Sequence, residues 1–498
     1  MEHREGLFDF IMTQQEFFTL AETHNVIPIS KTFFADTLTP VSAFLRLREG
    51  SSSSFLFESV EGGERFARYS FIGRDPIASL RCKEKITIVQ EKDATHTTSE
   101  NFFDVVEDFL HRYTQPPLSH LPSFYAGLVG FIGYDAIRFI EDIPLQNSAS
   151  MPFDESMLLF FSSVFIIDHF KHQITLVVNC VIEKEHNRTE LYEQAQKKIA
   201  MLESLLLNAN YFPNIFRAFP ERIESEIAKE EFLESVNKAK EYIAAGDIFQ
   251  VVLSQRFSMK YSGDVFDVYR ALRIVNPSPY LYFLDFEGMN IIGSSPEILV
   301  RAMNGIAEVF PIAGTSPRGR TEEEDKHFEE QLLADEKERA EHIMLVDLGR
   351  NDLGRVCEIG SVKIDQLMNV VRYSHVMHIA SRVAGKIVEE KNIIDVFRAV
   401  FPAGTVSGAP KIRAMEIIDE LEKSRRGIYA GGVGYFDFSG NMDMCITIRT
   451  IVAVNGTMYF QSGAGIVADS DAEKEFEETM NKSRALFEAV KKAENVFL

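Results

Sequence analysis

The chain has 498 residues, 45% of them hydrophobic and 25% charged, which excludes a disordered, collagenous or coiled-coil protein for the bulk of the sequence. Its 52 Lys and Arg against 74 Asp and Glu give a formal net charge of −22, which opposes binding to nucleic acid or to an anionic membrane through overall charge. An anionic ligand would therefore need local cations or a bound metal ion.

The cysteine pattern and the hydropathy predict a soluble, cytoplasmic protein. Cys82, Cys180, Cys357 and Cys445 show no C-x-x-C spacing, so a reducing compartment is expected and a zinc site is not. The N-terminal residues contain no apolar signal region, and no run of ~18 apolar residues could span a membrane.

The first part of the chain combines predicted strands with a long helix. Short β-branched and aromatic runs at 160–168 and 173–178 predict strands, and 188–207 predicts a helix. A segment rich in Asn and Pro follows and ends at Pro220. We therefore predict two domains, 1–220 and 221–498.

The second part begins with a clear amphipathic helix. Phe232, Val236, Ala239 and Ile243 recur at helical spacing, and Gly246 would end the helix before a strand at 248–257. A second helix is expected at 411–426, with Gly427 just beyond its end.

An antiparallel meander is predicted over 435–461. Asn455-Gly456 between two apolar runs is a strong hairpin signal, and alternation along 442–449 places Arg449 on the more polar face of a strand. Ser470 and Glu473 form a capping box that opens a last helix. Helices interspersed with hairpins indicate an α+β fold.

Two pairs of carboxylates have the same spacing. Glu338 and Glu341 are three residues apart on one predicted helix, and Glu475 and Glu478 repeat this on the last helix. If the pairs met, their repulsion would require a cation, and oxygen ligands suit Mg²⁺. From spacing alone, a solvated acidic helix face is the commoner interpretation.

Other candidate residues are ambiguous from pattern alone. The glycine-rich segment 401–411 could hold an anion at the start of a helix or could be an ordinary cap, and its spacing does not fit a Walker A loop. His378 lies between apolar residues, where a core histidine is the commoner interpretation. Arg449 and Lys482, taken singly, fit surface charges.

Several motifs occur together and in order. They are Gly293-Ser-Ser-Pro-Glu297, Pro311-Ile-Ala-Gly-Thr315, Glu341-His-Ile-Met-Leu-Val-Asp-Leu-Gly-Arg-Asn-Asp352, Gly404-Thr-Val-Ser-Gly-Ala-Pro-Lys411 and Glu478-Thr-Met-Asn-Lys482. Through these motifs the C-terminal ~270 residues closely resemble the chorismate-utilising enzymes and, among these, the large subunits of anthranilate synthases, and the N-terminal half matches them with looser motifs. The resemblance implies large antiparallel sheets with helices packed outside, and a lyase that converts chorismate and an amino donor into anthranilate and pyruvate, as the first committed step of tryptophan biosynthesis.

The resemblance assigns roles to these residues. It implies that Glu341 and Glu478 bind Mg²⁺, with Glu338 and Glu475 nearby, which favours the metal interpretation of the two pairs. The expected substrate-binding residues are Tyr429, Arg449, Gly463, Gly465 and Lys482.

The expected catalytic residues are His378, Glu297, Thr315 and Gln250. Glu297 corresponds to the acid that helps the C4 hydroxyl leave, because hydroxide is a poor leaving group. His378 corresponds to the residue implicated in pyruvate loss, where a base must take the C2 proton.

Two positions distinguish this sequence from sister activities. Gln250 stands where isochorismate and salicylate synthases have a lysine base that activates water. Ala313 stands where aminodeoxychorismate synthases typically have a nucleophilic lysine. Ammonia adding at C2 is the remaining interpretation.

The family obtains ammonia from a glutamine amidotransferase subunit and is inhibited by tryptophan. None of the four cysteines lies in a Gly-x-Cys-x-Gly turn, so the amidotransferase is expected as a separate partner. The segments Phe57–Val60 and 276–280 resemble the tryptophan site, with Phe57 and Leu281 departing from the usual Leu and Met. The implied effector residues are Glu58, Ser59, Asn276, Pro277, Pro279 and Tyr280.

Two alternatives stay open. An aminodeoxychorismate synthase component I is opposed by Ala313 and by the tryptophan-site motifs. A catalytically silent tryptophan-binding relative is opposed by the presence of the expected metal, substrate and catalytic residues.

Overall fold

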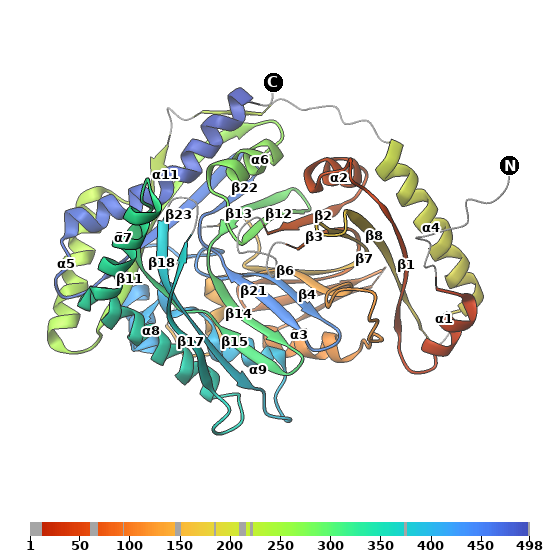
Figure 1. Ribbon diagram of the computed structural model, residues 1–498, viewed down its shortest axis with the longest axis horizontal. Coiled ribbons are helices and arrows are strands. Elements are labelled where there is room, and N and C mark those ends of the chain that lie inside the picture. Colours follow the sequence, from red (N-terminus) through yellow and green to blue (C-terminus); the bar gives the residue numbers. More distant parts are fainter. Residues whose placement is uncertain are drawn as a thin grey trace.

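The computed structural model describes residues 12–59, 68–92, 94–144, 151–183, 186–208, 216–219, 223–372 and 376–496. Large antiparallel sheets form its centre and helices lie around them (Figure 1). This confirms the predicted α+β class. The helices are α1 (Gln14–Leu20), α2 (Pro40–Leu47), α3 (Phe102–His111), η1 (Tyr134–Phe139), α4 (Arg188–Asn208), α5 (Lys229–Ala245), α6 (Phe266–Val275), α7 (Glu322–Ala334), α8 (Glu336–Gly354), α9 (Ile393–Val400), η3 (Gly404–Val406), α10 (Lys411–Leu421) and α11 (Ala472–Val496).

One sheet runs from the first strand to the catalytic half of the chain. Its strands pair antiparallel in the order β1, β8, β7, β3, β2, β12, β13, β22, β23 and β11. Their bounds are β1 (Val26–Phe34), β2 (Ser53–Glu58), β3 (Tyr69–Lys83), β7 (Ser156–Asp168), β8 (Gln173–Val181), β11 (Gln250–Ser262), β12 (Tyr280–Phe286), β13 (Met289–Ser295), β22 (Thr450–Val454) and β23 (Thr457–Ile466); the short strands β9 (Arg217–Ala218), β10 (Glu224–Ser225) and β19 (Gly408–Ala409) also pair with β11.

The other sheet branches from the same two long strands. Its order is β5, β4, β3, β7, β6, β20, β21, β14, β15, β18 and β17, and β16 also pairs with β18. The bounds are β4 (Ile86–Glu91), β5 (Ala94–Thr98), β6 (Gly127–Ile132), β14 (Ile298–Met303), β15 (Ile306–Val309), β16 (Ile312–Pro317), β17 (Lys363–Arg372), β18 (Val376–Lys386), β20 (Gly432–Asp437) and β21 (Met442–Ile446).

Strand β3 passes from one sheet to the other at an interruption in its ladder. Its first part pairs with β2 and its last part with β4, and its register against β7 shifts between Pro76 and Ala78. Asp75 has a positive φ of 58°, and Pro76 has no N–H to donate. The chain therefore bends here, which lets one strand serve both sheets.

A continuous apolar core connects the two sheets. It includes Ile291 from the first sheet and Leu80 and Val433 from the second, all at most 1% exposed. Helices α2, α4, α6 and α11 contribute to a second apolar cluster with strands of the first sheet. Within the described residues, no helix is both long enough and apolar enough to cross a membrane.

The predicted domain boundary at residue 220 lies outside the described residues. Strands from before and after it pair directly: β2 with β12, and β6 with β20. The sheets are thus continuous between the two halves of the sequence.

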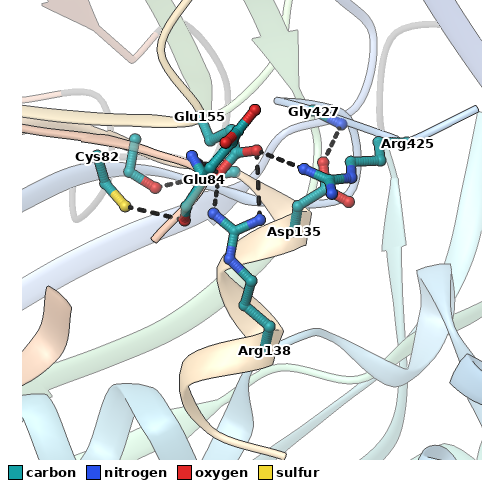
Figure 2. Close-up of polar contacts among 9 residues, drawn as sticks. Cys82, Glu84, Asp135, Arg138, Glu155, Arg425 and Gly427 are labelled. Atoms are coloured by element: carbon teal, nitrogen blue, oxygen red, sulfur yellow. Dashed lines mark hydrogen bonds and ion pairs between the residues drawn. The ribbon is translucent and has the colours of Figure 1, made fainter. Parts of the chain in front are cut away.

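A buried polar cluster also joins the halves, and Figure 2 shows it. Glu155 forms ion pairs with Arg138 and with Arg425, whose Nη1 lies 3.1 Å from Glu155 Oε1. Asp135 Oδ2 accepts a 2.8 Å hydrogen bond from the Gly427 backbone N–H. These contacts hold the loop that follows α10 against the first half of the chain.

Local sequence signals predicted several elements correctly. Helix α5 ends before Gly246, which adopts a left-handed conformation with φ 85°. Asn455 and Gly456, both with positive φ, connect β22 to β23 as predicted.

Two predicted helix boundaries were wrong. Helix α10 ends at Leu421 instead of 426, because Arg426 is buried and donates to the carbonyl oxygens of Val406 and Val252. At the start of α11, Asp471 Oδ1 accepts from the Lys474 N–H, whereas Ser470 Oγ accepts from the Val467 N–H. The cap is therefore one residue later than predicted.

Candidate active site

Glu297 lies in the turn between β13 and β14 and is partly buried. Thr405 Oγ1 donates a 2.9 Å hydrogen bond to Glu297 Oε2. Burial raises the pKa of Glu297, while Thr405, Arg449 and Lys482 oppose the rise. A carboxyl that keeps its proton to higher pH is suited to general acid catalysis, and its electrostatic partners place Arg449 and Lys482 in the same site.

His378 on β18 lies beside Thr315 on the adjoining β16. His378 Nδ1 is 2.8 Å from the Gly314 carbonyl oxygen and 3.1 Å from Thr315 Oγ1. A carbonyl oxygen only accepts, so the bond to Gly314 requires the hydrogen on Nδ1 and leaves the lone pair on Nε2. Burial lowers the pKa of His378, and the charge of Arg449 lowers it further. The imidazole is therefore a neutral base at pH 7.

Arg449 occupies a turn, and its predicted place on a strand was wrong. Strand β21 ends at Ile446 and β22 begins at Thr450, and Arg449 has a left-handed φ of 49°. Its Nη1 donates to Asn276 Oδ1 at 3.2 Å. The charge of Arg449 lowers the pKa of both Glu297 and His378, so this cation lies near both side chains.

The glycines of β23 allow other expected residues to approach the backbone. A Cβ atom on Gly463 would lie 2.7 Å from Tyr429 Oη. Lys482 Nζ donates to the Gly463 carbonyl oxygen at 3.0 Å. Tyr429 is 9% exposed, and burial raises the pKa of its hydroxyl, so the group is a neutral donor. The structure thus brings these three residues together.

Gly465 and Gln250 make a similar close approach. A Cβ atom on Gly465 would lie 2.7 Å from Gln250 Nε2, which donates to Glu341 Oε1 at 3.4 Å. Among the described residues, the buried Gln250 Oε1 has no hydrogen-bond partner. Gln250 therefore connects the strand glycines to the carboxylates of α8.

The four carboxylates of α8 and α11 influence one another, as the repeated spacing suggested. Burial raises the pKa of Glu338, and the negative charges of Glu341 and Glu478 raise it further. Burial and the charge of Glu478 also raise the pKa of Glu475. Lys482 Nζ lies 2.7 Å from Glu478 Oε1. We call Glu338, Glu341, Glu475 and Glu478 the acidic cluster.

The acidic cluster does not have the arrangement of a metal site. Among the residues that the structure describes, no group of three or more His, Cys, Asp or Glu side chains has that arrangement. Its oxygen donors and mutual repulsion nevertheless fit a hard cation such as Mg²⁺.

Lys411, the last residue of the glycine-rich segment 401–411, has a structural role. Lys411 Nζ lies 2.8 Å from Asp352 Oδ2 and 2.7 Å from the Val400 carbonyl oxygen. Because the ammonium group is paired inside the protein, this lysine does not serve as an anion-binding group.

Four of the six expected effector residues line one cavity of about 320 Å³. Glu58 and Ser59 come from the first half of the chain, and Pro279 and Tyr280 from the second. Asn276 and Pro277 are not among the lining residues. Asn276 instead contacts Arg449, as described above.

Pattern reasoning assigned no role to Gly314 or Thr405. Gly314 has a φ of 70°, and its carbonyl oxygen holds His378. Thr405 holds Glu297. Both occur within the motifs quoted above, which is the signal that could have identified them.

Comparison with known proteins shows the family of this chain. A model of the family described as chorismate binding enzyme matches residues 52–488. The chain therefore belongs to the chorismate binding enzymes.

Particular relatives cover nearly the whole chain. Anthranilate synthase component 1 of Acetivibrio thermocellus is 46% identical, over 97% of this chain and 99% of that protein. The protein of the same name from Aquifex aeolicus is 47% identical, over 97% of this chain and 98% of its own. The crystal structure of anthranilate synthase component I from Streptococcus pneumoniae is 37% identical with a TM-score of 0.72, covering 91% of this chain and 98% of that one.

Proposed function

We propose that this chain is component 1 of an anthranilate synthase, which aminates chorismate at C2 and then releases pyruvate. The observation that carries the proposal is the position of Arg449, whose charge acts on both Glu297 and His378. The substrate is a dianion, so a cation near both a proposed acid and a proposed base can hold a carboxylate beside them. Near-full-length identity to anthranilate synthase components supports the same function.

In the first step, ammonia adds at C2 of chorismate and both ring double bonds shift, from C1=C2 to C1=C6 and from C5=C6 to C4=C5, as the C4 hydroxyl leaves. Protonated Glu297 donates to that hydroxyl, so that water departs instead of hydroxide. In the second step, His378 Nε2 takes the C2 proton as the bond to the enolpyruvyl oxygen breaks. The ring becomes aromatic and pyruvate is released.

Arg449 and Tyr429 hold the enolpyruvyl carboxylate in this proposal, beside the backbone of Gly463 and Gly465. Glu341 and Glu478 would hold Mg²⁺, with Glu338 and Glu475 as nearby carboxylates. When bound, the cation would neutralise the ring carboxylate of the substrate.

Ammonia is favoured over competing nucleophiles by two side chains. Gln250 is an amide without a basic lone pair, so it cannot activate water. Ala313 on β16 cannot form a covalent adduct with the ring.

A separate glutamine amidotransferase subunit supplies the ammonia in this proposal, as the designation component 1 of the relatives implies a partner. Tryptophan is the proposed effector, in the cavity lined by Glu58, Ser59 and Tyr280. The first 220 residues would then form a domain that contributes to regulation, and the remainder would form the catalytic domain.

Incubating the purified chain with chorismate, Mg²⁺ and ammonium at alkaline pH tests the proposal. Fluorescent anthranilate and pyruvate in equal amounts are expected, without any amidotransferase. Formation of 4-amino-4-deoxychorismate would instead identify an aminodeoxychorismate synthase. An absence of turnover would favour a silent tryptophan-binding relative.

A further inference from the structure

Arg426, in the loop that follows α10, is buried, and four hydrogen bonds fix its guanidinium. Nε and Nη2 donate to the two carboxylate oxygens of Glu422 at 2.9 and 2.6 Å. Nη1 donates to the Val406 carbonyl oxygen, and Nη2 also donates to the Val252 carbonyl oxygen, both at 2.7 Å. These bonds use the edge of the planar group and leave its faces to other partners.

Glu422, the partner of Arg426, is anchored in turn by the first sheet. Its Oε1 accepts from the Ser254 backbone N–H at 2.8 Å and from Ser254 Oγ at 2.9 Å. Gln461 Nε2 donates to the same hydroxyl at 2.9 Å. The carboxylate that faces Arg426 is therefore fixed by β11 and β23, two strands that also contribute residues to the candidate site.

Two tyrosine rings lie against the guanidinium. Arg426 Cζ is 4.7 Å from the centroid of the Tyr134 ring and 5.5 Å from the centroid of the Tyr429 ring, and both distances fit a cation–π contact. The Tyr429 backbone N–H also donates to the Arg426 carbonyl oxygen at 3.3 Å. Arg426 therefore contacts Tyr429 through both its backbone and its side chain.

Stability alone does not explain a buried arginine at this place. Packed apolar side chains often stabilise a fold as well as a buried ion pair does, so such a pair is weak evidence for a purely structural role. A cation held at its edge can, however, fix the orientation of a ring against its face.

We propose that Arg426 is a positioning residue for Tyr429, and that Glu422 holds it in place for this task. The inference rests on the proposed function, in which the Tyr429 hydroxyl binds the enolpyruvyl carboxylate of chorismate. Arg426 itself does not touch the substrate. It sets the direction of the Tyr429 hydroxyl, which points to the backbone of Gly463 on β23.

Steady-state kinetics of the full chain with ammonium and Mg²⁺ test the positioning role. Arg426→Lys keeps the charge but cannot make the four hydrogen bonds. It should raise KM for chorismate roughly tenfold and change kcat less, because the bond from Tyr429 to a charged group is misaligned. Arg74→Lys is the matched control, since Arg74 is 6% exposed and pairs with Asp75 on β3, and its KM should be unchanged. An unchanged KM for Arg426→Lys would overturn the inference.

The same substitution in a Tyr429→Phe chain separates positioning from a general loss of structure. Tyr429→Phe already lacks the hydroxyl, so Arg426→Lys should raise KM there by less than about twofold. An equal rise in both backgrounds would mean that Arg426 acts by another route, and would overturn the inference. If Arg426→Lys does not fold, Glu422→Gln, which loosens the same guanidinium, replaces it in both backgrounds.

The proposed function fails separately if the unmodified chain makes no anthranilate. The Kd for chorismate, measured by calorimetry without ammonium, then decides the positioning role by the same comparison of backgrounds.

Discussion

The negative charges of two groups of carboxylates in this protein have opposite surroundings. In the cluster of Figure 2, Glu155 faces two arginines, and Asp135 accepts a backbone N–H. In the acidic cluster, burial raises the pKa of Glu338 and Glu475, and neighbouring carboxylates raise it further. Charges paired inside the protein hold the fold together, whereas carboxylates that repel one another are candidates for binding a cation. The comparison thus distinguishes a structural cluster from a candidate functional one.

The largest effect on activity is expected at His378, the proposed base. His378→Met should lower anthranilate formation by about 10²–10⁴-fold, because it removes the group that takes the C2 proton. The aminated intermediate should accumulate in product analysis while pyruvate release stops. His327→Met, a change at an exposed histidine on α7, is the control. Normal anthranilate output from His378→Met would refute the assigned role.

Disrupting the ion-paired cluster of Figure 2 should lower the stability of the fold. Glu155→Ala leaves two largely buried arginines without their shared carboxylate, and we expect a loss of about 3–5 kcal/mol in the free energy of unfolding. Urea unfolding measures it.

Glu183→Ala is the matched control, since its ion pair with Lys92 is more than half exposed on both sides. It should cost less than about 1 kcal/mol. Equal losses in the free energy of unfolding for the two substitutions would contradict the expected difference between buried and exposed pairs.

A substitution in the acidic cluster should change the dependence of activity on Mg²⁺. Glu478→Gln should weaken the apparent Mg²⁺ affinity for turnover by at least about tenfold, without lowering stability in the absence of metal. A Mg²⁺ titration of activity and a thermal melt in chelator measure the two effects. Glu477→Gln, an exposed neighbour on α11, should change neither. An unchanged titration for Glu478→Gln would exclude it as a ligand.

The fold could be predicted from sequence where the determinants are local. Gly246 and the pair Asn455-Gly456 are specified by their own backbone preferences, and both were predicted. The end of α10 depends on the distant carbonyl oxygens of Val252 and Val406, which bind Arg426, and no local pattern reveals them. Pairing across residue 220 is equally a long-range property.

The candidate site shows the same division. Helical spacing alone identified the two carboxylate pairs, but only the fold brings α8 and α11 together. The roles of Glu297, Tyr429 and Arg449 came from the family resemblance, because isolated residues carry no periodic signal. Asn276 was placed with the effector residues through the motif of the resemblance, and that motif does not reveal that its side chain contacts Arg449.

A smaller effect on stability is expected from the repulsion within the acidic cluster. Glu338→Gln removes one like charge three residues from Glu341, and should raise stability by about 0.2–0.5 kcal/mol in the presence of chelator. Glu336 lies in the same first turn as Glu338, so Glu336→Gln removes a favourable interaction with the helix N-terminus without relieving that repulsion, and should lower stability slightly. Thermal unfolding distinguishes the signs, and a loss of stability for both would contradict mutual repulsion.

The smallest expected effect is the release of a fraction of a proton when Mg²⁺ binds. Burial and neighbouring carboxylates raise the pKa of Glu338 and of Glu475, so both carboxyls keep their protons to a higher pH than an exposed glutamate does. The raised folded-state pKa also means that each group lowers stability above that pKa, and that this loss is relieved as the pH falls through it.

Mg²⁺ held by the acidic cluster as proposed would require the ionised form and lower both pKa values, so binding should release more protons near pH ~5 than near pH ~8. Calorimetry in two buffers of different ionisation enthalpy measures the number released at each pH. A chain carrying both Glu338→Gln and Glu475→Gln should release none at either pH. Equal release at the two pH values would mean that the protons come from other groups, and that the repulsion within the acidic cluster is not relieved by the metal ion.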